Sequence, residues 1–191
     1  LTLGASAGNS SIGIYSKGGA VINNGSSTIG DNSLGIYGEE TSVTTNDMTI
    51  GDKGVGVYLN NTALGQGDVT VNGNVSVGGN EAIGIQASNA KTYLYGDLSV
   101  GAGDSKGIFS ENDGDVETTG DITVGSNSLG IYKNGNAEVK TAAGKTITIA
   151  DDGYGIFAKG AKVTNNGAVT VGKNGVGIYV DGNDLNSAGN V

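Results

Sequence analysis

Residues 28–37 read Thr-Ile-Gly-Asp-Asn-Ser-Leu-Gly-Ile-Tyr, and residues 123–132 read Thr-Val-Gly-Ser-Asn-Ser-Leu-Gly-Ile-Tyr. Both stretches end in an apolar residue followed by Gly, Ile and an aromatic residue. This marker, or a close variant, recurs eight times along the chain, with its glycines 21 to 28 residues apart. A period of this length indicates a repeat architecture, in which each unit buries its apolar side against its neighbours.

Two further strand signals accompany each marker. Ahead of it stand Ser or Thr, a β-branched residue and usually Gly, as in Thr28-Ile29-Gly30. After it comes an apolar residue, usually Val, in an alternating run, which ends in Asn and Gly at Val21–Gly25 and Val163–Gly167. Each repeat of about 23 residues therefore carries three short strands separated by turns. The sequence predicts an all-β parallel β-helix of about eight coils, with residues 1–191 forming a single repeat segment.

The alternation of apolar residues predicts which side chains enter the core. In the third strand, pairs such as Val75 and Val77 share an inward face. In the first strand, we expect the residue before the marker glycine and the Ile after it to point inward, with the glycine and the aromatic residue pointing outward. Lys106 and Tyr154 fall at the first of these inward places, where neither fits easily. A lysine there is expected to extend its ammonium group towards a turn.

Extra residues lengthen the repeat at Leu59–Gln66 and at Ala142–Lys145. Insertions in repeat proteins usually form surface loops, so loops are expected at both places.

The aromatic residue of the marker supplies the candidate binding surface. Stacked coils should bring these side chains into an outward ladder, which Gln86 interrupts. Such a ladder can contact sugar rings or a protein partner, or it can simply stabilise the coil. The candidate residues are Tyr15, Tyr37, Tyr58, Phe109, Tyr132, Phe157 and Tyr179.

Composition narrows the classes of function. The formal net charge is −9, and every positive charge is a lysine. Proteins that bind nucleic acids usually show a basic stripe, so a nucleic-acid partner is not expected. The chain has no His and no Cys, which excludes a histidine-based triad, a cysteine nucleophile and a conventional zinc site.

The remaining polar residues do not indicate catalysis or a cofactor. The acidic stretches Glu111–Asp115 and Asp151–Asp152 carry oxygen ligands suited to Ca²⁺, but they are interpreted as solvated turns. The other acids are scattered through turns, without the clustered carboxylates and base of a polysaccharide-degrading site. We therefore expect a protein that is not an enzyme and that holds no metal or cofactor.

The marker, the Thr-Val-Gly signal and the Val-x-Asn-Asn-Gly run together resemble the passenger regions of type V autotransporters, and look most like the large fusobacterial autotransporter adhesins. The resemblance implies a right-handed β-helix exposed on the outer membrane, which attaches to other bacteria, host receptors or glycans, or spaces a binding region from the cell. Both ends of the sequence fall inside the repeat, so we expect a fragment of a longer array. The resemblance implies that such an array is anchored to the membrane only through a C-terminal barrel outside this sequence. The competing hypothesis is a polysaccharide lyase or hydrolase with the same architecture.

Overall fold

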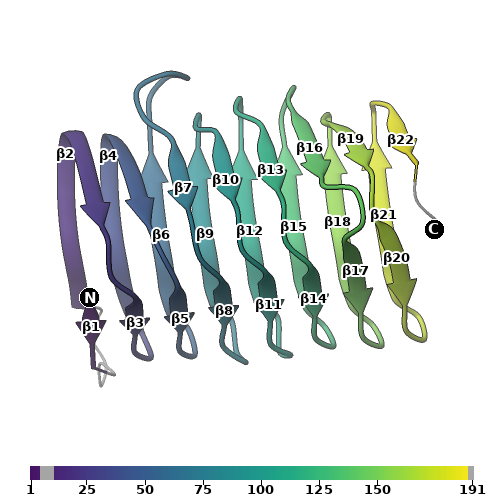
Figure 1. Ribbon diagram of the computed structural model, residues 1–191, viewed down its shortest axis with the longest axis horizontal. Helices are drawn as coiled ribbons and strands as arrows, with labels where there is room; N and C mark the ends of the chain where they lie inside the picture. The colour runs from purple at the N-terminus through teal and green to yellow at the C-terminus, as the bar shows by residue number, and fades with distance from the viewer. Residues whose placement is uncertain (5–10, 189–191) are drawn as a thin grey trace.

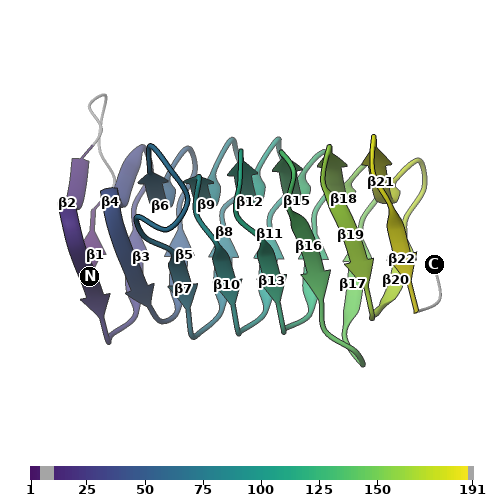
Figure 2. The same cartoon turned by 90° about the horizontal axis from the view of Figure 1, so that it is seen from above.

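The computed structural model describes residues 1–4 and 11–188. These residues form β-strands and turns wound into a parallel β-helix of about eight coils, which confirms the predicted fold (Figure 1). The coils follow one another along a single axis, with β1 and β22 near opposite ends of the rod (Figures 1 and 2). Within the described residues, no helix is long and apolar enough to span a membrane.

Each coil contains a first, a second and a third strand. The first strands are β2 (Ser11–Asn23), β4 (Ser33–Thr45), β6 (Val55–Asn60), β9 (Ile83–Ser88), β12 (Lys106–Glu111), β15 (Leu129–Asn134), β18 (Tyr154–Lys159) and β21 (Val176–Asp181). β2 and β4 continue without a break into the second strand. The other second strands are β7 (Val69–Val71), β10 (Thr92–Leu94), β13 (Val116–Thr118), β16 (Glu138–Thr141), β19 (Lys162–Asn165) and β22 (Leu185–Ser187). The third strands are β1 (Thr2–Leu3), β3 (Ser27–Ile29), β5 (Met48–Ile50), β8 (Val75–Val77), β11 (Leu98–Val100), β14 (Ile122–Val124), β17 (Thr146–Ile149) and β20 (Ala168–Val171).

Equivalent strands pair in parallel from coil to coil. The third strands form one eight-stranded sheet, and the first and second strands are joined through β4 into a 14-stranded sheet. The pairing keeps equivalent residues opposite one another, so that Ile108 lies between Ile85 and Ile131. Like side chains therefore stack in columns along the axis, and the core is a continuous set of such columns.

The second and third strands point their side chains as predicted. In the third strands, Val75, Val77 and their equivalents in the inner coils are buried, whereas Val171 in the last third strand is 40% exposed. In the second strands, the predicted valine column is buried, and Thr92 takes the valine place in one coil. The buried hydroxyl of Thr92 has no hydrogen-bond partner, whereas that of Thr141 donates to Asn165 Oδ1 over 2.6 Å.

The first strands differ from the prediction at two of their positions. In the inner coils the Ile or Val after the glycine is buried as expected, but the residue before the glycine is half-buried or exposed, so its predicted inward orientation is wrong. Lys106 is half-buried and Tyr154 is 43% exposed. Both residues occupy an outward column, which removes the difficulty of placing a lysine and a tyrosine in the core.

The marker glycine explains this difference, because it faces inward and interrupts the alternation. A Cβ atom on Gly107 would lie 2.5 Å from the carbonyl oxygen of Gly130 and 2.6 Å from Leu98 Cδ2. At this glycine the first strand packs against Leu98 and Val100 of the preceding third strand, β11, and leaves no room for a side chain. Two consecutive residues, Gly107 and Ile108, are consequently buried, and the outward positions lie on both sides of them.

Turn side chains bond each coil to the next. Asp47 Oδ1 accepts the backbone N–H of Asn74 over 2.8 Å, and Asn74 Oδ1 accepts that of Asp97 over 2.8 Å. In the same way, Asp97 Oδ1 accepts the backbone N–H of Asp121 over 2.9 Å, and Asp121 Oδ1 accepts that of Thr146 over 2.7 Å. Such bonds satisfy backbone donors that the strand ladders leave unpaired.

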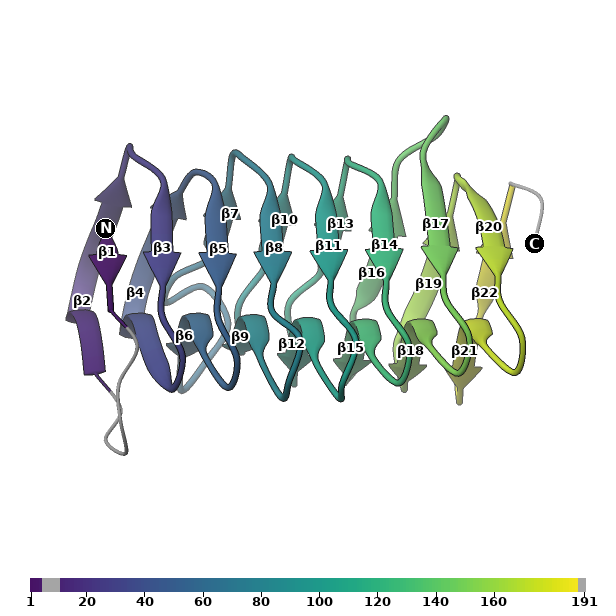
Figure 3. The same ribbon diagram turned by 90° about the horizontal axis from the view of Figure 1, so that it is seen from below.

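The two insertions form loops. The first, from Asn61 to Asp68, connects β6 to β7 and extends beyond the turns of the other coils (Figure 1). It starts later than predicted, because Leu59 is a buried residue of β6. The second, residues 142–145, connects β16 to β17 as predicted (Figure 3).

Candidate functional site

The marker aromatics stack into the predicted ladder on the outer face of the first strands. Ring centroids are 5.3 Å apart for Tyr15–Tyr37 and 5.2 Å apart for Tyr37–Tyr58. After Gln86, which pairs in register between Tyr58 and Phe109, the ladder resumes. The three separations in this second block are 4.7 Å for Phe109–Tyr132, 5.8 Å for Tyr132–Phe157 and 4.7 Å for Phe157–Tyr179.

The rings of the second block are nearly parallel. Their planes are within 20° of parallel, and their centroid separations of 4.7 to 5.8 Å fall within the ~4.5–7 Å range of interacting aromatic pairs. Phe109, Tyr132 and Phe157 are half-buried, so part of each ring is open to solvent.

A second outward column runs beside the ladder. It consists of the residue before each marker glycine, which pairs in register from coil to coil through Lys106, Leu129 and Tyr154. The full column is Ile12, Leu34, Val55, Ile83, Lys106, Leu129, Tyr154 and Val176. Simple alternation predicts that these residues lie in the core, so the sequence did not reveal that the outer face carries a second, largely apolar column.

The two columns enclose a shallow hollow of about 450 Å³ over β12, β15 and β18. One side is formed by the ladder residues Phe109, Tyr132 and Phe157, and the other by the second column. The six residues that line it are Lys106, Phe109, Leu129, Tyr132, Tyr154 and Phe157.

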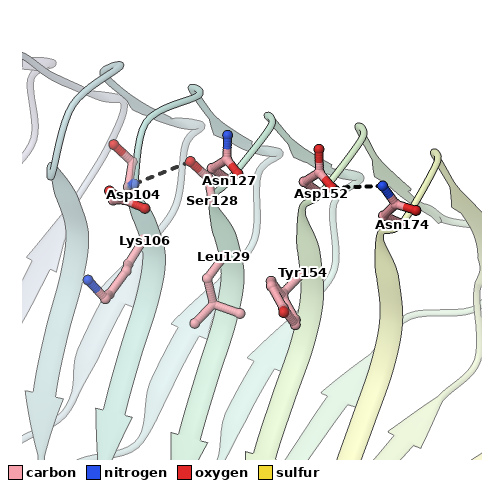
Figure 4. Close-up of a pocket in the computed structure, with 9 residues that line it drawn as sticks. Asp104, Lys106, Asn127, Ser128, Leu129, Asp152, Tyr154 and Asn174 are labelled. Atoms are coloured by element: carbon pink, nitrogen blue, oxygen red, sulfur yellow. Dashed lines mark hydrogen bonds between the residues drawn. The ribbon is translucent and has the colours of Figure 1, made fainter.

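An adjoining hollow of about 430 Å³ shares Lys106, Leu129 and Tyr154 with the first. It continues to the turns between the third and first strands, where polar side chains lie beside the shared residues (Figure 4). Its polar lining consists of Asp104, Ser105, Asn127, Ser128, Asp152 and Asn174. We call the two hollows together the aromatic groove, and these polar residues its rim.

The backbone fixes the positions of the rim residues. Asp104, Asn127, Asp152 and Asn174 all have positive φ angles between 54° and 64°, a conformation that Asn and Asp adopt more readily than most residues. Bonds between coils hold them in line: the Asp104 N–H donates to the Asn127 carbonyl over 2.9 Å, and Asn174 Nδ2 donates to Asp152 Oδ1 over 3.2 Å. The rim is therefore a regular polar edge along the groove.

At the N-terminal end, the ladder has a charged partner. The Tyr37 hydroxyl donates to Glu39 Oε1 over 2.9 Å, and Lys17 Nζ lies 3.1 Å from Glu39 Oε2. The hydrogen bonds from Lys17 and from Tyr37 lower the pKa of the Glu39 carboxyl group. The hydrogen bond between Tyr37 and Glu39 also raises the pKa of the Tyr37 hydroxyl.

Lys133 is a titratable group that sequence reasoning missed. It follows the ladder residue Tyr132, points into the core and is fully buried. Its Nζ donates to the Asn112 carbonyl over 2.6 Å and to Ser110 Oγ over 3.2 Å. Burial lowers the pKa of this ammonium group to about 8, although the acidic residues of the neighbouring turn oppose the shift. The one available signal was a lysine at a place where other coils have small or apolar residues.

Apart from Glu111, which ends β12, the acidic stretches lie in turns: residues 112–115 join β12 to β13, and Asp151–Asp152 lie between β17 and β18. Asp115 Oδ1 accepts the backbone N–H of Glu138 over 3.0 Å, and Asp151 Oδ1 accepts that of Lys173 over 2.7 Å. In the part of the chain that the structure describes, no three acidic side chains approach closely enough to hold a metal ion.

Comparisons with models of protein families, with curated proteins and with solved structures found no match to this chain.

Proposed function

We propose that this chain is a non-catalytic segment of a bacterial cell-surface autotransporter adhesin, whose β-helix presents an attachment surface. The observation that carries the proposal is the aromatic groove, a solvent-facing apolar strip on a sheet whose backbone is already paired. Exposed apolar strips rimmed by polar residues mark interaction sites in soluble proteins. The repeat pattern that resembles autotransporter passengers supports the cellular setting.

The side chains around the groove favour binding over catalysis. The rim carboxylate of Asp152 accepts a hydrogen bond from Asn174 in the next coil. The nearby Asp151 accepts a backbone N–H, as do the other turn acids described above. Acids used in this way stabilise coil stacking, and they are not paired with a base that would activate a nucleophile.

The test is attachment of the purified, fluorescently labelled chain to bacterial and host cells. Tyr132→Ala removes a ring from the groove, and Tyr58→Ala removes a ladder ring outside it. We expect Tyr132→Ala to reduce attachment and Tyr58→Ala to leave it nearly unchanged. Equal attachment by both variants, at wild-type level, would contradict a binding role for the groove.

Coil deletion separates an attachment surface from a spacer stalk. Removing residues 106–153 takes out two coils and joins Ser105 to Tyr154, which has the register place of Lys106. Removing residues 34–82 likewise joins Ser33 to Ile83 and leaves the groove intact. Loss of attachment only in the first deletion supports the proposal, whereas attachment by both deletions favours a stalk.

A second candidate function is a polysaccharide-degrading enzyme, because the carboxylates of Asp104 and Asp152 border the groove. Release of reducing sugars from a panel of polysaccharides tests it. Turnover that Asp104→Asn or Asp152→Asn abolishes would replace the binding proposal with this one.

A further inference from the structure

We propose that the aromatic groove binds a linear, uncharged polysaccharide lying along the rod axis. This inference rests on the proposed function and names the chemical class of its ligand. It follows from the pairing of the strands beneath the groove, the chemistry of the two columns and the rim, and the charge around them.

The paired backbone excludes a common mode of peptide binding. Under the groove, β12 pairs with β9 and β15, and β15 pairs with β18. Their backbone N–H and C=O groups are used between coils, so an extended peptide has no free strand edge to join. A ligand of this face is therefore held by side chains alone.

The side chains that remain fit a sugar polymer. The half-buried rings of Phe109, Tyr132 and Phe157 line the groove, and Leu129 and Tyr154 extend the apolar surface. The C–H faces of sugar rings are apolar and can pack against such a surface, while their hydroxyl groups need hydrogen-bond partners. The amide and carboxylate groups of Asn127, Asp152 and the other rim residues lie beside that surface and supply donors and acceptors (Figure 4).

Charge selects among polysaccharides. The groove holds the carboxylates of Asp104 and Asp152 and the ammonium group of Lys106, and the chain carries a net charge of −9. Like charges on a sulfated or uronic acid polymer would be repelled, and no arginine is present to bind them bidentately. The groove therefore favours uncharged sugars.

The columns repeat at the strand spacing of ~4.8 Å. An aromatic ladder residue lines the groove at each of β12, β15 and β18, so a chain of sugar units can contact several coils at once. Affinity should rise with the length of the oligosaccharide until the groove is filled.

The experiment measures binding of oligosaccharides to the immobilised chain by surface plasmon resonance. The probes are linear oligomers of glucose, mannose and N-acetylglucosamine, from disaccharides upward in length, with hyaluronan and heparin as polyanions. We expect at least one uncharged series to bind with affinity that increases with length, and Tyr132→Ala to weaken it about tenfold, since 1.4 kcal/mol corresponds to a tenfold change. Tyr58→Ala is the matched control, and circular dichroism checks the fold of each variant.

A second variant guards against misfolding of Tyr132→Ala. The second column already accepts Lys106, so Leu129→Gln should fold normally and should also weaken binding of the uncharged oligomer. Binding of the polyanions alone, or no binding by any uncharged series, would overturn the inference.

Two outcomes separate this inference from the proposed function. If the chain attaches to cells, and Tyr132→Ala blocks attachment while no sugar binds, the groove takes a protein surface and only the ligand class is wrong. If wild-type chain dimerises in analytical ultracentrifugation and Tyr132→Ala is monomeric, a second copy covers the groove and the inference fails.

Discussion

Replacing Lys133 with methionine measures what a buried ammonium group costs this β-helix. The pKa of Lys133 falls from 10.5 to about 8 in the folded chain, a difference of about 2.5 units. At 1.36 kcal/mol per unit, the folded state is destabilised by about 3 kcal/mol when Lys133 is charged, relative to its neutral form. Methionine has a similar length and no charge, and it fits irregular core space.

The substitution also removes two hydrogen bonds. The Asn112 carbonyl belongs to an exposed turn residue and can bond to water instead, but Ser110 is fully buried and loses the hydrogen bond that Lys133 donates to it. An unsatisfied buried hydroxyl costs about 1–3 kcal/mol. The net expectation is a gain of about 0–2 kcal/mol in the free energy of unfolding at pH 7, or a rise of up to roughly 8 °C in the melting temperature.

The pH dependence gives the sharper test. Between the folded pKa of about 8 and the unfolded value of 10.5, the unfolded state binds more protons at this site, so stability rises with pH. The cost is fully present below pH 8 and disappears above about pH 10.5. We expect the advantage of Lys133→Met over wild type, measured by urea unfolding from pH 7 to 10, to shrink as pH rises.

Lys140→Met is the matched control, because Lys140 is exposed on the neighbouring strand β16. It should change stability little and show no such trend. If Lys133→Met is less stable than wild type by more than 2 kcal/mol and the gap is independent of pH, the reasoning fails. Lys133 would then be a charged partner that the acidic turn requires.

Three further predictions concern stability. In urea titrations, Gly107→Ala should lower the free energy of unfolding by about 1–3 kcal/mol, because its Cβ would lie 2.5 Å from a carbonyl oxygen of the next coil. Gly25→Ala is the control and should be near neutral, because its Cβ would have no neighbour closer than 4.0 Å. Thr92→Val should stabilise by about 1 kcal/mol, since it removes an unpaired buried hydroxyl, and Thr141→Val should destabilise; equal effects of the two in thermal melts would contradict the hydrogen-bond assignment. The lowered pKa of Glu39 means that its contribution is present above its unfolded pKa of about 4.5 and is lost as pH falls through the lower folded value, so the melting temperatures of wild type and Glu39→Gln should converge at acidic pH.

The columns of the second and third strands were predictable, because simple alternation decides which side chains are buried there. Val75 and Val77 are separated by one residue in an uninterrupted strand, and both point inward as a period of two requires. The ladder was predictable for a related reason: in-register pairing brings equivalent residues together whichever face they occupy.

The groove could not be predicted in full, because the marker glycine breaks the alternation. Lys106, Gly107 and Ile108 are consecutive residues, and the burial of the last two depends on the packing of Gly107 against the preceding third strand. That contact is tertiary and has no local signal. The second column was consequently assigned to the core, and the apolar width of the outer face appeared only with the structure.

The stacking of short coils has a mechanical consequence. A coil of about 23 residues adds only ~4.8 Å to the folded rod, but the same residues fully extended span roughly 75 Å. Each coil that unfolds under tension would therefore extend about fifteenfold, adding roughly 70 Å to the rod while its neighbours stay folded, since contacts are confined to adjacent coils. Under a pulling force, such a rod can unfold one coil at a time from its end. Each unfolding step absorbs mechanical work, while the coils beneath the aromatic groove stay folded until the unfolding reaches them.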